Sequence, residues 1–543
     1  MWKIVRFCLA ALILLSSIHS SAQKKDKIKY KADELYEFRE KGQKIRRLIG
    51  NVVFAQETST MYCDSSLYYV KENIMEAYGR VRIVDDSVTI TSKKLIYDGN
   101  TRDSQLRENV VYRKGEQKLV TDFLDYNMDT EIGNYFNKGT LSDPTNTLKS
   151  ETGYFYGQAD YSLFWTNVVL DAPSYTLETD TLRYNSVTKE AISTGETVII
   201  TEDESILHAD GGVFRTELDQ SDFIDGTIET TDYYMEADKL FFDDLKKYYD
   251  AKGHVKLTAK NDDMIITGDK GYNDDKNGIS KVYGNAVMRR ILEEDTLYLS
   301  ADTLVSIESE YDSAKRILAY PNVKVWRYNL QGLSDSAAYY LQDSLLYFYF
   351  DPIFWNHKNQ IKGDTVVVEI TEEEIKSMDL LQNSFLTSQD TLLNFNQVKG
   401  RTMHAIFEAS EIHRIHVDGN SESVYYVLDE NDPKDIFTLG MNRILCSNIT
   451  IRFRDQEVYN VSFYVKPEAK FIPPHEFTPE IQRLKNFSWR SDERPSLEDV
   501  LHRKLEKQPQ NNGETPFIPP AEKINMEGAG SNPKKLKNLN NEG

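Results

Sequence analysis

Apolar and polar residues alternate along most of the chain between positions 50 and 370. In residues 81–84 and 88–90, for example, Arg or Thr separates Val from Ile, which is the period of a half-buried β-strand. Thr, Val, Ile and Tyr dominate such stretches, and Gly, Asn and Asp interrupt them where tight turns need a positive φ. Helical periodicity is scarce in this region. The pattern predicts an all-β fold of short strands joined by tight turns.

Two columns of residues recur in phase along the same region. The first column is a strand start closely preceded by Gly or Asn, and it returns about every 29 residues. Its members are Val52, Val81, Val110, Thr140, Val168, Thr197, Thr227, Val255, Ala286 and, after a longer step, Val323. The second column is aromatic and is usually followed by a turn former; its members are Tyr69, Tyr97, Tyr126, Tyr156, Tyr184, Phe214, Phe242 and Tyr272. One unit cannot bury its apolar face alone, so we expect the units to stack.

Several β-repeat folds have units of similar length. Leucine-rich repeats need a Leu-x-x-Leu-x-Leu frame, which is missing, and propeller blades are longer, at about 40 residues or more. A parallel β-helix stays open as an alternative. Turns of the Asn-Gly and Asp-Gly type favour hairpins, so we expect an elongated antiparallel β-jelly-roll or β-solenoid with two sheets. If each unit adds about two strands to each sheet, it lengthens the array by about 10 Å.

The N-terminus has the features of an export signal. Lys3 and Arg6 precede an apolar run at 7–15, and small residues at 20–22 predict cleavage after Ala22. Residues 1–22 are therefore expected to be a cleavable signal peptide, so the mature protein is expected to be secreted or exported to the cell envelope. The charged residues 23–49 are expected to form a polar N-terminal segment or cap, because the end of a repeat array needs a polar cover.

The remaining chain divides into three parts after the repeats at 50–370. Residues 371–399 are interpreted as an insertion, in which a capping box from Thr371 to Glu374 predicts a short helix at 372–384. Further strands are expected over 400–466. Proline, Asn and Lys enrichment over 467–543 predicts a largely disordered tail. A patch around Phe487 and Trp489 suits docking on a partner or folding against the last repeat.

Charge and cysteine content narrow the possible partners. The chain has 65 Lys and Arg against 86 Asp and Glu, a formal net charge of −21, which argues against nucleic acid or an anionic membrane surface as the main partner. Behind the signal peptide only Cys63 and Cys446 remain. They lie near opposite ends of the array, beyond the reach of a disulfide, so we expect both to be unpaired.

The sequence carries no pattern typical of an enzyme. It contains no Gly-x-Ser-x-Gly, phosphate loop or dinucleotide fingerprint. His404, His413 and His416 lack the Cys or carboxylate frame of a metal site, and residues three apart on a strand face opposite sides. We therefore predict no catalytic residue, no metal and no cofactor, and we interpret the protein as non-enzymatic.

The repeat resembles that of a known family. Units start with Gly-Asn-Val and end with Ala-Asp-x-Leu-x-[Tyr/Phe]-Asp, most clearly at Ala237–Asp243, with variants at 301–304 and 179–185. These motifs resemble the OstA-like (organic-solvent-tolerance-like, LptA-like) repeat of lipopolysaccharide-transport proteins. Segments near Val398, Asp418 and Met441 extend the resemblance to about residues 50–465. It implies a long form of the family, without the C-terminal outer-membrane barrel of the translocon.

The resemblance also implies a location and a function: the mature protein is expected in the periplasm, with association to the outer membrane left open. Family members hold lipid acyl chains in a β-jelly-roll groove and take part in outer-membrane assembly, so the expected partners are lipopolysaccharide, through its acyl chains, and the other transport components of the inner and outer membranes. The inward positions of the strand-start column are then the candidates for a lipid groove. They are Val52, Phe54, Val81, Ile83, Val110, Val168, Val255 and Val323.

Two other functions remain open from the sequence. A core and a groove use the same alternating pattern, so a structural or adhesive envelope protein with a closed core fits the same residues. A carbohydrate-active β-helix enzyme would instead need a cluster of acids on one exposed strand face of adjacent rungs.

Overall fold

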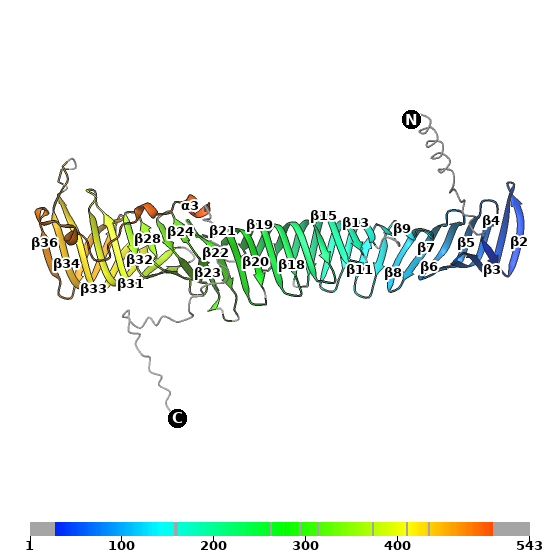
Figure 1. Cartoon of the computed structure of the whole chain (residues 1–543), viewed down its shortest axis with the longest axis horizontal. Coiled ribbons are helices and arrows are strands. Elements are labelled where there is room, and N and C mark those ends of the chain that lie inside the picture. The colour runs from blue at the N-terminus through cyan, green and yellow to red at the C-terminus, as the bar shows by residue number, and fades with distance from the viewer. Residues whose placement is uncertain are drawn as a thin grey trace, which may run out of the picture. The chain divides into compact units, whose positions relative to one another are not determined.

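The computed structural model describes residues 28–502, except 157–160, 186, 203, 232, 261–262, 275, 293–294, 310, 312–313, 372–373, 409–410, 430 and 433–434. The described residues belong to one unit, Met1–Arg503. The expected signal peptide and positions 503–543 of the expected tail lie outside the described residues. Within them, 36 strands form one hydrogen-bonded antiparallel sheet, and the strands follow one another along the array in chain order (Figure 1).

The first part of the array contains β1 (Lys29–Lys31), β2 (Glu34–Glu40), β3 (Gln43–Gln56), β4 (Ser59–Tyr69), β5 (Ile74–Asp85), β6 (Val88–Asp98), β7 (Asp103–Lys114), β8 (Gln117–Asn127), β9 (Ile132–Tyr135), β10 (Gly139–Ser142), β11 (Thr147–Ser150), β12 (Thr152–Tyr156) and β13 (Tyr161–Asp171). The middle contains β14 (Tyr175–Asn185), β15 (Glu190–Thr201), β16 (Ile206–Arg215), β17 (Gln220–Glu229), β18 (Tyr233–Asp243), β19 (Tyr248–Ala259), β20 (Met264–Asp274), β21 (Ile279–Ile291) and β22 (Thr296–Ile307).

The last part contains β23 (Arg316–Tyr320), β24 (Val323–Arg327), β25 (Leu330–Ser334), β26 (Ser336–Tyr340), β27 (Leu345–Tyr349), β28 (Ile353–Asn356), β29 (Asn359–Lys362), β30 (Thr365–Ile370), β31 (Ile375–Gln389), β32 (Phe395–Glu408), β33 (Glu411–Asp429), β34 (Phe437–Arg454), β35 (Glu457–Tyr464) and β36 (Glu468–Ile472). Four short helical segments follow, η2 (Pro474–Glu476), α2 (Pro479–Gln482), η3 (Ser491–Glu493) and α3 (Leu497–Leu501).

Each long strand bends at its middle, and this bend makes two sheets from one. In the pairing of β3 with β4, Ile49 lies opposite Ser65 and Val52 opposite Cys63, so Gly50 and Asn51 face the single residue between them. Both bulged residues have left-handed backbone, with φ of 78° and 43°. Such a bulge turns the strand sharply. We call the bend the corner, the strand halves on the side of Ile49 the first sheet, and those on the side of Val52 the second sheet.

Carboxylates brace the corners from the neighbouring strand. Asp64 accepts a hydrogen bond from the backbone N–H of Arg80 at 3.0 Å, and the hydrogen bonds from Arg80 hold the pKa of this carboxyl below its ordinary value. Aspartates at other corners accept from an Asn side chain in the same way: Asn51 to Asp33 at 2.8 Å, Asn285 to Asp269 at 2.9 Å, Asn322 to Asp302 at 3.1 Å and Asn383 to Asp364 at 2.7 Å. The Asp of the repeat motif Ala-Asp-x-Leu thus stabilises the bend of the strand.

The fold expected from the alternation is confirmed. All pairings of the described strands are antiparallel, and one repeat corresponds to one hairpin, such as β5 with β6. Because each long strand crosses the corner, a repeat of two such strands adds two half-strands to each sheet. The array begins earlier than expected: β1 and β2 lie within residues 23–49, and β2 is exposed along its whole length at the end of the array.

The helix expected at 372–384 is wrong. Strand β31 runs through this segment and pairs with β30 and β32. The local signal was real, since the Thr371 hydroxyl accepts from the Glu374 N–H at 3.1 Å. The same side-chain-to-backbone bond that caps a helix here closes the hairpin between β30 and β31.

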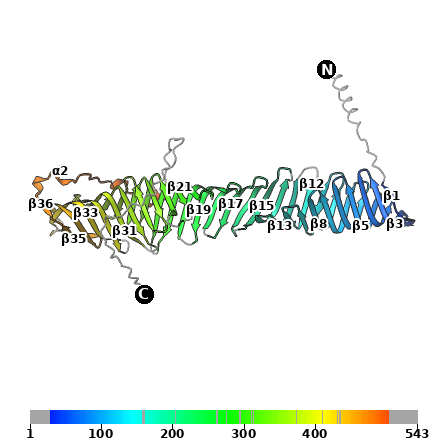
Figure 2. The same cartoon turned by 90° about the horizontal axis from the view of Figure 1, so that it is seen from below.

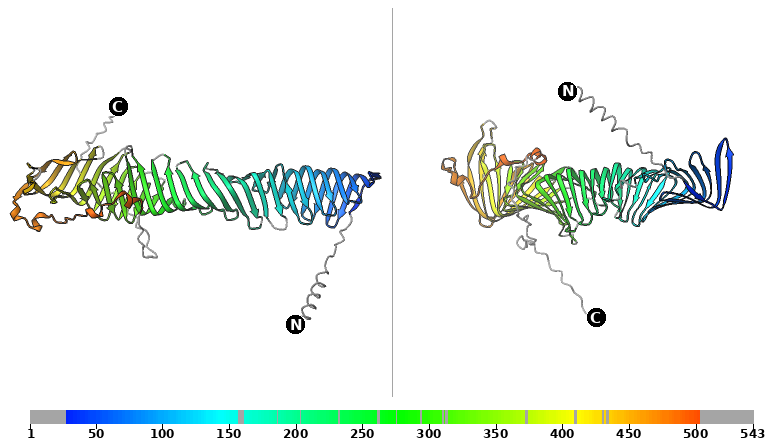
Figure 3. Two further views of the ribbon diagram at one scale, coloured as in Figure 1. Left: turned by 90° about the horizontal axis from the view of Figure 1, so that it is seen from above. Right: turned by 45° about the vertical axis from the view of Figure 1, so that its right-hand side comes forward.

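The described part of the expected tail is ordered and lies against the array. Residues 473–502, which we call the belt, run back over the outer face of the second sheet, as the orange ribbon shows from two sides (Figures 2 and 3). Its last helix, α3, contacts β21, β22 and β24. Buried glutamines of the sheet bond to the belt backbone as a neighbouring strand would: Gln397 with Gln482 O and Leu484 N (2.7 and 2.8 Å), and Gln360 with Ser488 O and Arg490 N (both 2.7 Å).

The corner geometry leads to a prediction about two glycines. Gly284 and Gly195 both have left-handed backbone, with φ of 74° and 84°. A Cβ at Gly284 would lie 2.8 Å from Asp269 Oδ2, whereas one at Gly195 would meet nothing within 4 Å. We expect Gly195→Ala to cost about 1 kcal/mol of local stability, from backbone strain alone, and Gly284→Ala about 2–3 kcal/mol.

Amide hydrogen exchange of the strands on either side of each corner measures both losses. Equal losses at the two glycines would contradict the role given to the corner aspartate.

Candidate functional site: the interior between the two sheets

The interior holds all eight residues predicted to line a lipid groove. Val52, Phe54, Val81, Ile83, Val110, Val168, Val255 and Val323 are each 0–2% exposed. The first seven belong to one apolar cluster, which extends from Ile28 to Val255. Val323 belongs to a second cluster, which extends from Val282 to Phe453. The alternation therefore identified the inward face, and in this conformation the inward face is a packed core.

Next to the corner, each inward valine lies opposite a small residue. The pairs across neighbouring strands are Val52 with Cys63, Val81 with Ser92, Val110 with Thr121, Val168 with Thr179, Val255 with Gly268 and Val323 with Ser334. The two sheets converge here, so only one large side chain of each pair fits. Cys63 is enclosed at this position, and burial raises the pKa of its thiol to about 12.

Aromatic residues close the interior on the side opposite the corner, which we call the mouth. Tyr97 of the first sheet donates to the Gln56 side chain of the second sheet at 2.7 Å. Tyr112 of the second sheet contacts Tyr126 and Phe155 of the first, with ring centroids 5.9 and 4.8 Å apart. The mouth is thus held by side chains, whereas backbone hydrogen bonds hold the strands within each sheet.

The aromatic column read from the sequence occupies both faces. Tyr97, Tyr126, Tyr184, Phe214 and Phe242 belong to the interior cluster or pack against it. At two units the inward ring is one residue earlier, Tyr68 beside Tyr69 and Phe155 beside Tyr156. A shift of one residue moves a side chain to the other face of a strand. The aromatic column therefore predicts which residues lie at the mouth, but it does not predict which of them point into the interior.

A buried arginine locks the mouth near the start of the array. Arg102 is 4% exposed. It bonds to the Ser59 hydroxyl at 2.9 Å, forms an ion pair with Glu57 of the same opposing hairpin, and pairs with Asp129 at 3.1 Å on its own side. Charged groups that are out of water are held in place by such partners. No local sequence pattern signals this lock, because the residues that meet are about two strands apart.

Between the two apolar clusters the interior is less well covered. Several inward side chains of β18, β19 and β20 are only partly buried: Met235 and Phe242 pack against the first cluster, and Leu257, Met264 and Ile266 against the second. We call this stretch the window. It lies near the middle of the array (Figure 1).

The three histidines considered for metal binding have separate partners. His404 Nδ1 lies 2.7 Å from Asp379, and this hydrogen bond raises the pKa of the imidazole. His416 Nδ1 bonds to Thr450 at 2.9 Å, and His413 pairs with Glu408 at 3.4 Å. Among the described residues no group of three or more His, Cys, Asp and Glu is placed to hold a metal. Cys63 and Cys446 are both free thiols, as expected.

The fold and interior define a class: an antiparallel β-repeat protein whose two sheets enclose a long apolar interior. The family model of OstA-like proteins matches residues 25–180, which include β1 to β13. Over this region the match confirms the resemblance stated from the repeat motifs. The match starts before Gly50, in agreement with the early start of the array. No curated protein matches the chain.

In the part of the chain that the structure describes, no helix has the length and apolar character needed to cross a membrane.

The lock at Arg102 leads to a prediction about the Cys63 thiol. Arg102→Gln removes the charge that Glu57 and Asp129 share, and breaking a buried pair weakens the local structure strongly. We expect Cys63 to react with a thiol reagent about tenfold to a hundredfold faster in this variant, because local opening is what exposes it. Mass spectrometry of the Cys63 peptide gives the rate.

Lys94→Gln is the matched control. It removes an exposed ion pair with Glu108 on the same part of the array, and exposed pairs contribute little. An Arg102→Gln rate equal to that of the control would show that the mouth is not locked there.

Proposed function

We propose that the protein is a periplasmic lipopolysaccharide-transport protein that serves outer-membrane assembly. The observation that carries the proposal is the long apolar interior, lined along the array by the inward column from Val52 to Val323, in a chain with an OstA-like N-terminal region. The interior shields acyl chains from water on their way between the two membranes. The protein works with the other transport components of the inner and outer membranes and is not an enzyme.

Lipid uptake requires the two sheets to separate at the mouth. The mouth contacts are made by side chains, such as Tyr97 with Gln56, and the corner is a bulge that can change its bend. The sheets can therefore move apart about the corner while the backbone ladder of each sheet stays intact. Acyl chains then replace the side-chain contacts that the closed interior makes with itself, so little apolar surface is exposed to water.

The window at β18–β20 is the place where a lipid first meets the interior. Leu257, Met264 and Ile266 are already partly exposed there, so less packing is lost on opening than at the enclosed Ile83. From the window, chains reach either cluster of the interior.

A closed structural or adhesive envelope protein is the second candidate, because the eight predicted groove residues are packed in the described conformation. The two functions differ in whether lipid ever reaches the inward side chains.

Photo-crosslinking at two adjacent isoleucines of β20 decides between them. Ile266 faces inward, opposite Met288, and Ile265 faces outward, opposite Arg289. We expect a photo-reactive residue at 266 to crosslink to lipopolysaccharide in living cells, and the same residue at 265 to give several-fold less product. The two positions share strand, depth in the array and side-chain type, so they differ only in face.

A third probe at Ile83 tests how far the lipid travels inside. Lipopolysaccharide adducts at both 266 and 83 are expected for a conduit. Adducts at neither inward position, in cells that export lipopolysaccharide normally, would sink the transport function and leave the closed envelope protein.

A further inference from the structure

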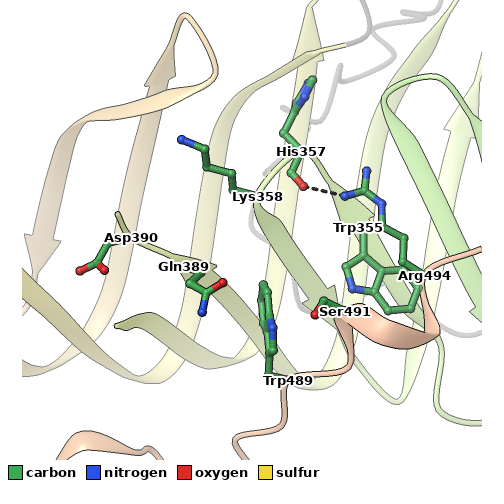
Figure 4. A pocket seen from close by; sticks show the side chains of 8 residues that line it. All are labelled: Trp355, His357, Lys358, Gln389, Asp390, Trp489, Ser491 and Arg494. Carbon is green, nitrogen blue, oxygen red and sulfur yellow. Dashed lines mark hydrogen bonds between the residues drawn. The ribbon is translucent and has the colours of Figure 1, made fainter. Parts of the chain in front are cut away.

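A pocket lies between the belt and the outer face of the second sheet. It has a volume of about 240 Å³ and is lined by Trp355, His357, Lys358, Gln389, Asp390, Trp489, Ser491 and Arg494. In the close view, Trp489 and Ser491 of the belt lie on one side, Lys358 and His357 on the other, and Trp355 closes one end (Figure 4). The pocket is thus built by segments more than a hundred residues apart in sequence.

The walls of the pocket are held rigidly. Arg494 donates to the His357 carbonyl at 2.8 Å and to Gln331 at 2.7 Å. His357 is fixed in turn by Glu411 at 2.8 Å. Trp489 packs on Phe395 with ring centroids 5.3 Å apart. A preformed shape of this kind lowers the cost of ordering side chains on binding.

One buried donor in the pocket has no acceptor. Trp355 is 2% exposed, and among the described residues nothing accepts from its indole Nε1. This nitrogen points toward the space beside Ser491 and Trp489 (Figure 4). A buried N–H without a partner costs free energy comparable to a lost hydrogen bond, so an acceptor in the pocket would stabilise the site.

The chemistry of the lining selects the class of ligand. Trp489 offers an aromatic surface and Trp355 a fixed donor, and the Lys358 ammonium lies at the rim. Gln389 and Ser491 are further hydrogen-bonding groups, and the carboxylate of Asp390 suits a sugar hydroxyl as donor. An apolar ligand would leave the Trp355 N–H unpaired. The volume lies below that of pockets for drug-sized ligands, about 300 Å³ or more, which favours a single ring over a nucleotide.

We propose that this pocket binds a sugar ring that carries an acidic substituent. The ring lies against Trp489, one of its oxygens accepts from Trp355 Nε1, and its carboxylate or phosphate pairs with Lys358. Saccharides in a cell envelope come from lipopolysaccharide or from other glycans, and the same chemistry recognises both. The site is on the outside of the second sheet, so it goes beyond the proposed lipid interior and stands independently of it.

Titration of the full chain with small sugars tests the site. The probes are glucose, glucuronic acid and glucose 1-phosphate, and calorimetry gives the affinities. We expect the two acidic sugars to bind at least about tenfold more tightly than glucose, because a charge-assisted contact is added. Failure of all three to bind at millimolar concentration would overturn the proposal.

Three substitutions separate the groups that bind. Trp355→Phe keeps the ring but removes the donor, and we expect about threefold to tenfold weaker binding. Trp489→Ala should weaken binding of all the sugars, whereas Lys358→Gln should abolish only the preference for acidic ones. Trp165→Phe, in the first part of the array and away from the pocket, is the control and should bind as the wild type does.

Hydrogen exchange over residues 484–500 verifies that the belt stays docked in each variant. Lys358 is exposed, so its substitution tests the site even if a tryptophan variant loosens the belt. Wild-type affinity in both Trp355→Phe and Lys358→Gln would contradict the proposal.

Two larger ligands identify the source of the sugar. Lipid-free core oligosaccharide and soluble peptidoglycan fragments are compared in the same titration. Binding of the core oligosaccharide assigns the pocket to lipopolysaccharide sugars, and binding of the fragments alone assigns it to the cell-wall glycan. If neither of the two larger ligands binds, an envelope glycan is overturned as the ligand.

Discussion

The corner in each strand is the constraint on which the structure depends. An antiparallel meander is by itself an open sheet with two faces, and one face of this sheet is apolar. A bulge of residues such as Gly50 and Asn51 in left-handed conformation folds each long strand at the same level, so the apolar face closes on itself. The aspartates occupy the level of the bend, where they bond to the neighbouring corner. Without the regular corners, the inward valines would face water.

The sequence predicted what recurs locally and missed what meets over long distances. The alternation and the phase of the two columns follow from each unit's own residues. The fold and the inward positions of Val52 to Val323 could therefore be predicted from the sequence. The lock at Arg102 and the contact of Trp355 with the belt depend on which segments meet in space. No local pattern encodes such contacts. The capping box at Thr371 shows the opposite case: the local hydrogen bond was predicted correctly, but it lies in a hairpin and not at the start of a helix.

The belt was misread for a related reason. Its prolines and polar residues lack strand alternation, which is also true of disordered chain. What orders it is a set of acceptors and donors on the sheet, Gln360 and Gln397, whose burial only the structure reveals. In the sequence these glutamines look like ordinary polar residues of an exposed strand face. Where a side chain takes the place of a neighbouring strand in bonding to the backbone, the sequence of the bonded segment shows no strand periodicity.

The chain-order pairing of the strands also has a kinetic meaning. Nearly every strand finds its partner in the hairpin just before it, and such local pairings close short loops at low entropic cost. A chain that emerges N-terminus first during synthesis can therefore fold as it emerges, with each finished strand serving as the template for the next. Folding then proceeds strand by strand from the N-terminal end, and only the belt docks after the strands beneath it have formed.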